Sequence, residues 1–337
     1  MPIDSESPLV TVIMPVRNEE VFIRWSLGAV LGQDYPPDRL EVLVVDGDST
    51  DRTAAIVQAM AQTDARVRLL HNPARMQARA LNLALDVARG DVIVRVDGHT
   101  IITPDYVSRC VTHLRQTGAD NVGGPQRAVG MTLWGRAVAA AHRSSFGIPS
   151  RFRVGSHAGY VDTVYMGAWP RDVFDRVGRF DESVGVHEDY EFNYRIRRAG
   201  GRVYLTPDIR STYYGRQTPA GLWRQFFRYG EAKAIMLRRF PASVRLRHLA
   251  APGFVLVVAT GIILAPFFRM IRRFWQLALL SYSAANAAAS LRTAARDGWD
   301  VLTRLPLVFV CMHIAWGCGF WFSVCRMIGA SIYERGS

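Results

Sequence analysis

The chain has 337 residues, of which 49% are hydrophobic, and this is enough for one large domain or two modest ones. Its formal net charge is +12, yet no run of Lys and Arg is long enough to form a nucleic-acid-binding arm, so we expect no nucleic-acid partner. Its four cysteines form no CxxC pair, which excludes the common zinc sites. The opening stretch MPIDSESPLV is acidic and polar, unlike a signal peptide, which predicts that the domain after it stays in the cytosol.

Residues 9–129 alternate between two kinds of segment. Short apolar runs rich in β-branched residues are typical of buried strands, and apolar residues at helical spacing are typical of helices. The expected strands are residues 9–14, LEVLVVDGDST with its acidic turn, VRLLHN, DVIVRVDGHT with its polar exit, and one further strand in DNVGGPQRAV. The expected helices are EEVFIRWSLGAVLGQ, DRTAAIVQAMAQT, MQARALNLALDVAR and PDYVSRCVTHLRQTG. This alternation predicts an α/β fold with a mostly parallel sheet covered by helices on both faces.

Polar clusters follow three of the expected strands. They are Arg17-Asn18, Asp46-Gly47-Asp48 and Asp97-Gly98-His99. The carboxyl ends of parallel strands meet at one edge of a sheet, and ligands bind there. We therefore expect the three clusters to converge on one rim. Residues 142–165, rich in Gly, Ser and Arg, are expected to form a long loop of the functional kind.

Three apolar segments follow the soluble part of the chain, at residues 249–268, 274–291 and 305–325. The first carries no charge over twenty residues, a length that fits one membrane span. The alternative is a buried helical hairpin of a soluble domain. Arginines before the first segment indicate that it starts in the cytoplasm. The arginines at 269–273 would then lie in a loop outside the cytoplasm, which contradicts the preference of Lys and Arg for cytoplasmic loops. The second segment can therefore lie partly in the membrane interface.

Two of the polar clusters suit a nucleotide and a cation. A carboxylate at a strand end, such as Asp46 or Asp48, can accept hydrogen bonds from a base or a ribose, although either can instead cap the next helix. Asp97 and His99 lie two apart in a turn, so both can reach one point. A divalent cation on a diphosphate needs only one or two protein ligands, and an imidazole favours Mn²⁺ over Mg²⁺. The alternative is a turn aspartate beside a plain surface histidine.

The stretch VHEDYEFNYRIRRAGG groups Glu188, Asp189 and Glu191 ahead of three arginines. Acids at a helix start and arginines in its later turns are ordinary for a helix. Crowded carboxylates also repel one another, which raises a pKa. Transfer of a sugar with inversion needs one base to deprotonate the acceptor hydroxyl. Asp189 is the first candidate for that base and Glu188 the second, whereas Glu191 is expected to serve the helix.

Two later segments carry weaker signals. LWRQFFRYG puts Gln225, Arg228 and Tyr229 on one helix face, where Arg228 can pair with a leaving diphosphate. The alternative is an amphipathic linker with no catalytic part. In YMGAWPRDVF, Trp169 either lines an acceptor site or fills the core.

Taken together, seven segments in this order resemble the inverting glycosyltransferases of family 2. They are IMPVRNEE, VVDGDSTD, ARGDVIVRVDGH, GGP, MGAWPRDVFDRVGRFDE, HEDYEFNYRIRRAGG and RQFFRYG. The resemblance covers about residues 8–240 and is greatest to bacterial membrane-anchored members of the succinoglycan glucosyltransferase type, which build exopolysaccharide units on a lipid carrier. It implies a nucleotide-sugar-binding GT-A domain.

The resemblance also implies roles for individual residues. The nucleotide-sugar-binding residues it indicates are Pro15, Arg17, Asn18, Glu19, Asp46, Asp48, Asp97, Gln225, Arg228 and Tyr229. Asp97 and His99 are expected to bind a Mn²⁺ or Mg²⁺ ion, and Asp189 and Glu188 are expected to act in catalysis. The residues expected to contact the acceptor are Trp169 and Glu182.

Three features depart from the family pattern. DGD replaces the commoner DDG after the second strand, His99 replaces the second Asp of the DxD motif, and Tyr229 replaces the Trp of QxxRW. The last change, with only three candidate spans, argues against a processive polymer synthase. No G-x-G-x-x-G follows the first strand, which excludes a dinucleotide-binding dehydrogenase.

The predicted organisation is a catalytic domain over residues 1–220, an interface helix and linker over 221–248, and a membrane region with three helices over 249–331. The expected enzyme is a multi-pass protein of the inner membrane facing the cytoplasm. Its expected donor is a UDP-sugar and its acceptor a polyprenyl-diphosphate-linked saccharide. The rivals are a polyprenyl-phosphate sugar synthase and a non-catalytic membrane-anchored subunit. The sequence carries no signal for oligomeric state.

Overall fold

The computed structural model describes residues 7–147, 157–243 and 248–336. The chain divides into two compact units. The first contains residues 1–127 and 150–214, and the second contains residues 128–149 and 215–337. Each unit is considered by itself, beginning with the one that contains the sheet.

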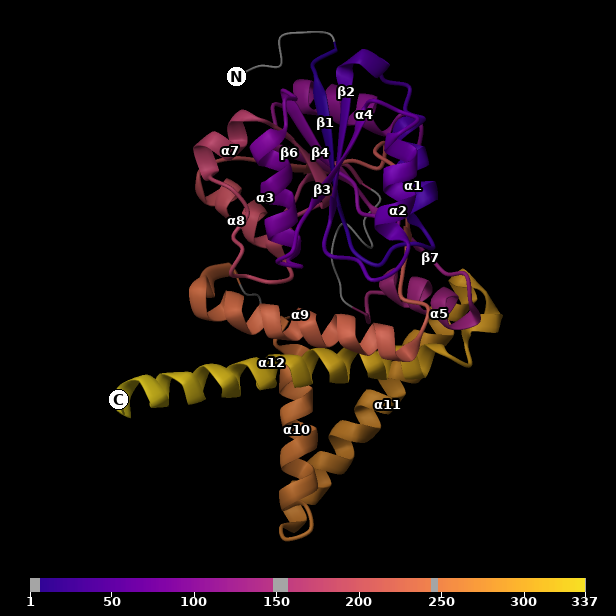
Figure 1. Ribbon diagram of the computed structural model, residues 1–337. Coiled ribbons are helices and arrows are strands. Elements are labelled where there is room, and N and C mark those ends of the chain that lie inside the picture. Colours follow the sequence, from indigo (N-terminus) through magenta and orange to yellow (C-terminus); the bar gives the residue numbers. More distant parts are fainter. Residues whose placement is uncertain (1–6, 148–156, 244–247, 337) are drawn as a thin grey trace. The chain divides into compact units, whose positions relative to one another are not determined.

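The first unit is built on an eight-stranded sheet in the order β3-β2-β1-β4-β9-β6-β10-β8 (Figure 1). Strands β1 to β4 run parallel to one another, and β9 runs antiparallel to both of its neighbours. Strands β5, β11 and β7 form a second, three-stranded sheet in the order β5-β11-β7. The bounds are β1 Val10–Val16, β2 Leu40–Asp46, β3 Val67–His71, β4 Val92–Arg95, β5 Thr100–Ile102, β6 Asn121–Gly124, β7 Gln126–Val129, β8 Gly159–Tyr160, β9 Tyr165–Pro170, β10 Val203–Leu205 and β11 Ser211–Tyr214.

Helices cover both faces of the large sheet, as the alternating pattern predicts. Helices α1 (Ile23–Leu31) and α2 (Thr53–Ala61) lie on one face (Figure 1). Helices α3 (Gln77–Val87), α7 (Asp172–Val177) and α8 (Glu188–Arg198) pack on the other, where they share one hydrophobic core. Helix α4 is Tyr106–Thr117, and the short 3₁₀ helix η1 is Pro37–Arg39. The predicted GT-A-like α/β architecture is confirmed.

One segment read as a single strand, DNVGGPQRAV, is in fact two strands. DVIVRVDGHT forms β4 and the predicted polar exit, and β5 of the other sheet begins only at its last residue, Thr100. DNVGGPQRAV forms β6 and β7, which also belong to different sheets. Pro125 separates that pair, and a proline has no N–H with which to continue the ladder.

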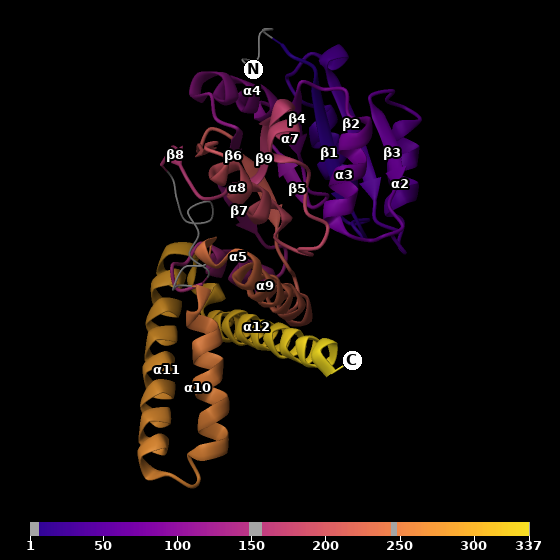
Figure 2. The ribbon, with the colours of Figure 1, turned by 90° about the vertical axis from the view of Figure 1, so that its left-hand side faces the viewer.

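The second unit is helical. Helices α9 and α12 lie side by side, and α10 and α11 form a hairpin (Figures 1 and 2). The bounds are α5 Leu133–His142, α9 Pro219–Arg239, η2 Pro241–Ser243, α10 Ala250–Leu264, α11 Arg269–Asp297, η4 Trp299–Val301 and α12 Leu305–Gly336. A Cβ added at Gly230 of α9 would collide with the backbone of Trp316, and one at Gly319 of α12 would collide with the backbone of Phe227. The two glycines therefore allow the α9 and α12 backbones to touch.

Of the three predicted membrane helices, the described residues contain one that is long and apolar enough to cross a bilayer. It is Leu305–Gly329 of α12, and half of the most apolar stretch of this helix is buried inside the protein. Helix α10 has 15 residues, about 22 Å of helix, which is shorter than the roughly 30 Å hydrocarbon core. Helix α11 does not meet the same criterion. The expectation of three spanning helices is therefore not supported.

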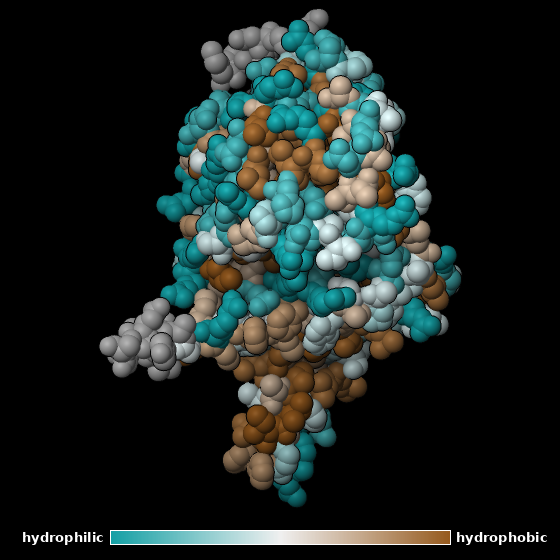
Figure 3. All heavy atoms as spheres, viewed as in Figure 1, coloured by the Kyte–Doolittle hydropathy of each residue, from teal (hydrophilic) through white to brown (hydrophobic). Residues whose placement is uncertain are grey.

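The α10–α11 hairpin nevertheless exposes many large apolar side chains, and Figure 3 shows them as a brown surface. They include Leu256, Val257, Ile262, Ile263, Phe267, Phe268, Met270, Phe274, Leu277 and Leu280. An exposed apolar surface of this kind marks a protein or membrane interaction site.

Candidate functional site

The turns that leave β1 and β2 are joined by hydrogen bonds. Asn18 Oδ1 accepts from the backbone N–H of Thr50 at 2.8 Å, and the N–H of Asn18 donates to Ser49 Oγ at 2.9 Å. Asn18 and Asp48 both have positive φ, a conformation that Asn and Asp tolerate better than most residues. The first two predicted clusters are thus brought together at the carboxyl ends of neighbouring parallel strands.

Asp46, the last residue of β2, is 5% exposed. Its Oδ2 accepts from the N–H of Ser49 at 3.0 Å, whereas its Oδ1 is buried with no hydrogen-bond partner. A buried carboxylate oxygen without a partner is costly unless a ligand supplies a donor. This is the feature expected of a residue that accepts from a base N–H or a ribose hydroxyl.

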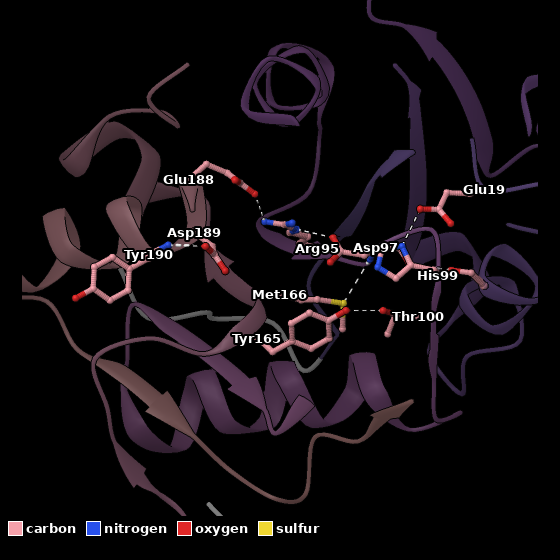
Figure 4. Close-up of polar contacts among 11 residues, drawn as sticks. Glu19, Arg95, Asp97, His99, Thr100, Tyr165, Met166, Glu188, Asp189 and Tyr190 are labelled. Carbon is pink, nitrogen blue, oxygen red and sulfur yellow. Dashed lines mark hydrogen bonds and ion pairs between the residues drawn. The ribbon is translucent and has the colours of Figure 1, made fainter. Parts of the chain in front are cut away.

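The third cluster contains a paired histidine. His99 Nδ1 lies 2.8 Å from Glu19 Oε1, as drawn in Figure 4. A carboxylate only accepts, so Nδ1 carries the proton and the lone pair of Nε2 is left for a metal. Carboxylates that orient metal-binding histidines in this way are common. Glu19 thus contacts His99, and its predicted contact with the nucleotide stays a prediction.

Asp97 supplies the second potential metal ligand. Its Oδ1 accepts from Arg95. The same part of the chain contains no group of three or more His, Cys, Asp or Glu side chains arranged for a metal. A two-residue set of one carboxylate and one imidazole fits a Mn²⁺ or Mg²⁺ ion that takes its other ligands from a diphosphate and water.

Replacing Glu19 with glutamine is expected to weaken metal binding by about tenfold to a hundredfold, because the amide no longer fixes the His99 tautomer. The measurement is Mn²⁺ binding to the purified protein, followed by electron paramagnetic resonance of the free ion. The control is Glu20→Gln, because Glu20 is bonded to the backbone of Arg52 instead. Equal Mn²⁺ affinity for Glu19→Gln and the unchanged protein would show that Glu19 does not orient a metal ligand.

Arg95, which the sequence analysis did not single out, joins two of the predicted motifs. Its Nε donates to Asp97 Oδ1 and its Nη1 donates to Glu188 Oε1, both at 2.8 Å. All three side chains are nearly fully buried. Arg95 thus ties the end of β4 to the start of α8 across 93 residues of sequence (Figure 4). Buried ion pairs of this kind require good geometry on every partner.

The electrostatics of this cluster are those of a crowded acidic site. Burial raises the pKa of Glu188, Arg95 opposes this, and the charge of Asp189 adds to it. Burial lowers the pKa of Arg95, but the carboxylates of Asp97, Glu188 and Asp189 outweigh this and hold it above its ordinary value. Asp189 therefore acts electrostatically on both partners of the buried pair. Figure 4 shows Asp189 beside Glu188 at the start of α8, with its Oδ1 accepting from the N–H of Tyr190 at 2.7 Å.

Unusual backbone conformations surround these residues. Met166 and His187 have positive φ, which is rare outside glycine. His187 immediately precedes Glu188, and the sulfur of Met166 accepts from the N–H of Asp97 at 3.4 Å. Residues held in sparsely populated conformations gather at functional sites, because only a well-packed surrounding can maintain them.

Glu191 has the structural role predicted for it. Its side chain is fully buried and forms an ion pair with Arg195 one turn later, at 2.6 Å. Arg195 also donates to the backbone carbonyls of Val177 and Arg179. The acids and arginines of this helix thus serve two purposes, one in packing α8 and one at its start.

Trp169 does not line an acceptor site. It is 0% exposed and packs edge-on against Phe174, Phe180 and Phe192 in the core. The alternative interpretation, a core aromatic, is the correct one, because a fully buried ring cannot contact a substrate.

The remaining predicted residues lie at the surface or in other interactions. Arg17 is exposed, and Pro15 is partly buried in β1. Asp48 forms an ion pair with Arg75, which lowers the pKa of Asp48. Glu182 accepts from Asn82 of α3 at 2.9 Å. Their ligand contacts stay predictions.

Gln225, Arg228 and Tyr229 lie on α9, in the second unit. Gln225 Nε2 donates to the hydroxyl of Tyr229 at 3.0 Å, so these two side chains lie along one helix face as the spacing predicts. Their contact with a diphosphate stays a prediction.

Known proteins resemble this chain over nearly its whole length. The sequence model described as "Glycosyl transferase family 2" matches residues 11–178. The succinoglycan biosynthesis protein ExoA of Rhizobium meliloti (strain 1021) is 31% identical over 316 residues, 92% of this chain and 93% of that protein. A dolichyl N-acetyl-alpha-D-glucosaminyl phosphate 3-beta-D-2,3-diacetamido-2,3-dideoxy-beta-D-glucuronosyltransferase of Methanococcus voltae is 23% identical over 92% of this chain and 95% of its own.

A solved structure has the same fold. The mannosyltransferase PcManGT of Pyrobaculum calidifontis, in complex with GDP-Man and Mn²⁺, aligns with a TM-score of 0.60 and 24% identity over 94% of this chain and 89% of its own. Together with the ExoA match, these findings show that the chain belongs to glycosyl transferase family 2 and is a transferase enzyme.

Proposed function

We propose that this glycosyltransferase moves a sugar from a UDP-sugar to a hydroxyl of a polyprenyl-diphosphate-linked saccharide, with inversion, at the cytoplasmic face of the inner membrane. The observation that carries the proposal is the buried bridge Asp97–Arg95–Glu188 with Asp189 beside it. It links the residues proposed for the donor phosphates to the residue proposed for the acceptor.

Asp189 is the proposed general base. Its carboxylate lies at the start of α8 beside the buried Arg95–Glu188 pair, and a carboxylate within reach of the acceptor can take the proton of its hydroxyl. Glu188 has its oxygen committed to Arg95, so it is proposed to orient the helix start that carries Asp189. This role makes Glu188 a positioning residue and leaves the proton transfer to Asp189.

The donor is proposed to lie against the ends of β1, β2 and β4. Asp46 Oδ1 would accept from the base or ribose, with Arg17, Asn18 and Asp48 around the nucleotide. Asp97 and His99 would hold a Mn²⁺ or Mg²⁺ ion, which supplies positive charge for the leaving diphosphate. Arg228, with Gln225 and Tyr229, is proposed to add charge and hydrogen bonds to the same group. Glu182 is proposed for the acceptor.

The lipid-linked acceptor has two supports. The name of the Methanococcus voltae relative gives a dolichyl-phosphate-linked sugar as its acceptor. The exposed apolar hairpin α10–α11 and the apolar helix α12 suit a protein that works at a bilayer. The proposed organisation keeps a catalytic domain in residues 1–220, an interface helix in 221–248 and membrane-associated helices in 249–331.

The test uses the purified full chain in detergent micelles. It is incubated with UDP- and GDP-sugars, with and without Mn²⁺, and with an undecaprenyl-diphosphate-linked saccharide or undecaprenyl phosphate. The expected result is release of UDP and a lipid-linked saccharide that is heavier by one sugar, detected by mass spectrometry. Transfer to undecaprenyl phosphate alone would instead identify a polyprenyl-phosphate sugar synthase. Absence of nucleotide release with every pair would overturn the proposed classes of donor and acceptor.

A further inference from the structure

A cavity of about 340 Å³ lies inside the second unit. It is formed where the start of α10 and the middle parts of α11 and α12 meet the residues that follow α5. This volume is within the range of small-molecule sites in proteins, roughly 300–1,000 Å³. The lining residues are Ser145, Phe146, Gly147, His248, Ala250, Ala251, Phe254, Tyr282, Met312, His313 and Trp316.

The walls of the cavity are mainly aromatic and aliphatic. Phe254 of α10 stacks on Tyr282 of α11 with ring centroids 4.2 Å apart. Phe146 packs edge-on against His313 at 5.0 Å and against Phe309 at 5.1 Å. Flat rings held by one another in this way form a rigid apolar surface.

Two of the polar side chains on the cavity wall, His313 and Tyr282, are hydrogen-bonded to each other. His313 Nε2 lies 2.9 Å from the backbone carbonyl of Phe146, and that carbonyl can only accept, so Nε2 carries the proton. His313 Nδ1 then accepts from the hydroxyl of Tyr282, also at 2.9 Å. Because these groups are bonded within the protein, they call for no polar ligand. Ser145, His248 and Trp316 add polar atoms to a wall that is otherwise apolar, so the chemistry that fits most of the space is hydrocarbon.

The helices that line the cavity also carry the apolar surface of the hairpin. Helix α10 supplies Phe254 to the cavity wall and carries Leu256, which is 45% exposed, and α11 supplies Tyr282 and carries Leu280, which is 68% exposed. Figure 2 shows these two helices as a pair, and Figure 3 shows the hydrophobic surface on them. A lipid that covers this surface therefore lies against the same two helices that line the cavity.

We propose that this cavity binds a single hydrocarbon chain of a lipid, held between Phe254, Tyr282 and Met312. Two sources of such a chain are available at a bilayer: the isoprenoid chain of the acceptor and an acyl chain of a membrane phospholipid. Assignment to the isoprenoid rests on the proposed function, whereas the hydrocarbon site itself does not.

The experiment is photolabelling of the full chain in micelles. One arm uses a farnesyl diphosphate with a diazirine on its chain, and the other uses phosphatidylglycerol with a diazirine on an acyl chain. Labelled peptides are located by mass spectrometry. We expect at least one probe to label the peptides containing Phe146, Tyr282 or Met312, and the labelling to saturate and to be displaced by the same lipid without the diazirine. The probe that labels identifies the source.

The matched variants are Ala251→Trp and Ala259→Trp. Both alanines lie on α10, but Ala251 lines the cavity and Ala259 is exposed. Ala251→Trp fills the cavity and is expected to lower saturable labelling about tenfold, a loss of about 1.4 kcal/mol, while Ala259→Trp leaves it unchanged. Should Ala251→Trp fail to fold, displacement by unlabelled lipid in the unchanged protein still decides the question.

The proposal is overturned if labelling of both probes spreads over the exposed faces of α10 and α11 and does not saturate. It is equally overturned if Ala251→Trp folds and labels as well as the unchanged protein. Labelling requires no sugar transfer, so a protein that labels in the cavity but transfers no sugar contradicts the proposed function alone.

Discussion

Replacing Asp189 with asparagine is expected to lower kcat for sugar transfer by about a hundredfold to ten-thousandfold. An asparagine has nearly the same shape but cannot accept a proton from the acceptor hydroxyl. Asp189 lies at the start of α8 and is partly exposed, so the change should leave the fold intact. The measurement is single-turnover transfer, with UDP binding followed separately by calorimetry.

Two comparisons make the result specific. Asp175→Asn changes an exposed aspartate on α7 of the same unit and is expected to leave kcat unaltered. UDP affinity should be the same in Asp189→Asn and the unchanged enzyme, because the nucleotide is proposed to contact the ends of β1, β2 and β4 instead. Near-normal turnover of Asp189→Asn would remove Asp189 from the role of base and favour an acceptor phosphate, which needs no base.

Replacing Arg95 with methionine is expected to destabilise the first unit by about 3–5 kcal/mol. The change leaves Asp97 and Glu188 buried without their cation, at the centre of the site. For a unit of this size the expected loss lowers the midpoint of thermal unfolding by about 10 °C. Differential scanning calorimetry in micelles measures it, and transfer activity should fall with it because both partners lose their positions.

A double variant tests whether the loss of stability in Arg95→Met comes from the unpaired buried carboxylates. Adding Glu188→Gln to Arg95→Met removes one of the two unpaired carboxylates, so the double variant should be more stable than Arg95→Met alone. Arg24→Met, an exposed arginine on α1, serves as the control and is expected to change the midpoint little. If Arg95→Met and Arg24→Met have the same midpoint, the buried bridge contributes nothing to stability.

The sheet was predictable because its signals are local. Apolar runs of β-branched residues and their polar exits define β1 to β4, and the order of alternation gives parallel strands. The splitting of DNVGGPQRAV between two sheets was missed, although Pro125, which has no N–H with which to continue a ladder, marks the point of division.

Arg95 could have been found from one anomaly. It is a charged residue inside VIVRV, where the other side chains belong to a buried strand. Arginine is almost never fully buried without partners, so the strand itself required acidic groups nearby. Asp97, two residues on, was visible in the sequence. Glu188 was a candidate for the base, but its pairing with Arg95 could not be predicted, because only the packing of α8 against the sheet brings the two together.

Two predictions failed because the hydrophobicity of a residue or a segment does not say what it packs against in the folded protein. Trp169 sits in a motif of the family, yet its neighbours Phe174, Phe180 and Phe192 enclose it. The segments after residue 248 are apolar enough for membrane contact, but the helix lengths and the packing of α12 differ from those of three independent spans. Composition predicted that these segments contact a membrane, but it did not predict the length of each helix or the packing of α12.

The glycine contact between α9 and α12 has a mechanical consequence. At Gly230 and Gly319 the two backbones meet with no side chain between them, so neither helix can slide or roll without moving the other. Helix α9 carries Gln225, Arg228 and Tyr229, so a movement of α12 also displaces these side chains. Under the proposed function, in which α12 lies at the bilayer and these three side chains contact the leaving diphosphate, a tilt of α12 imposed by bilayer thickness moves them, and turnover is expected to depend on the acyl-chain length of the surrounding lipid.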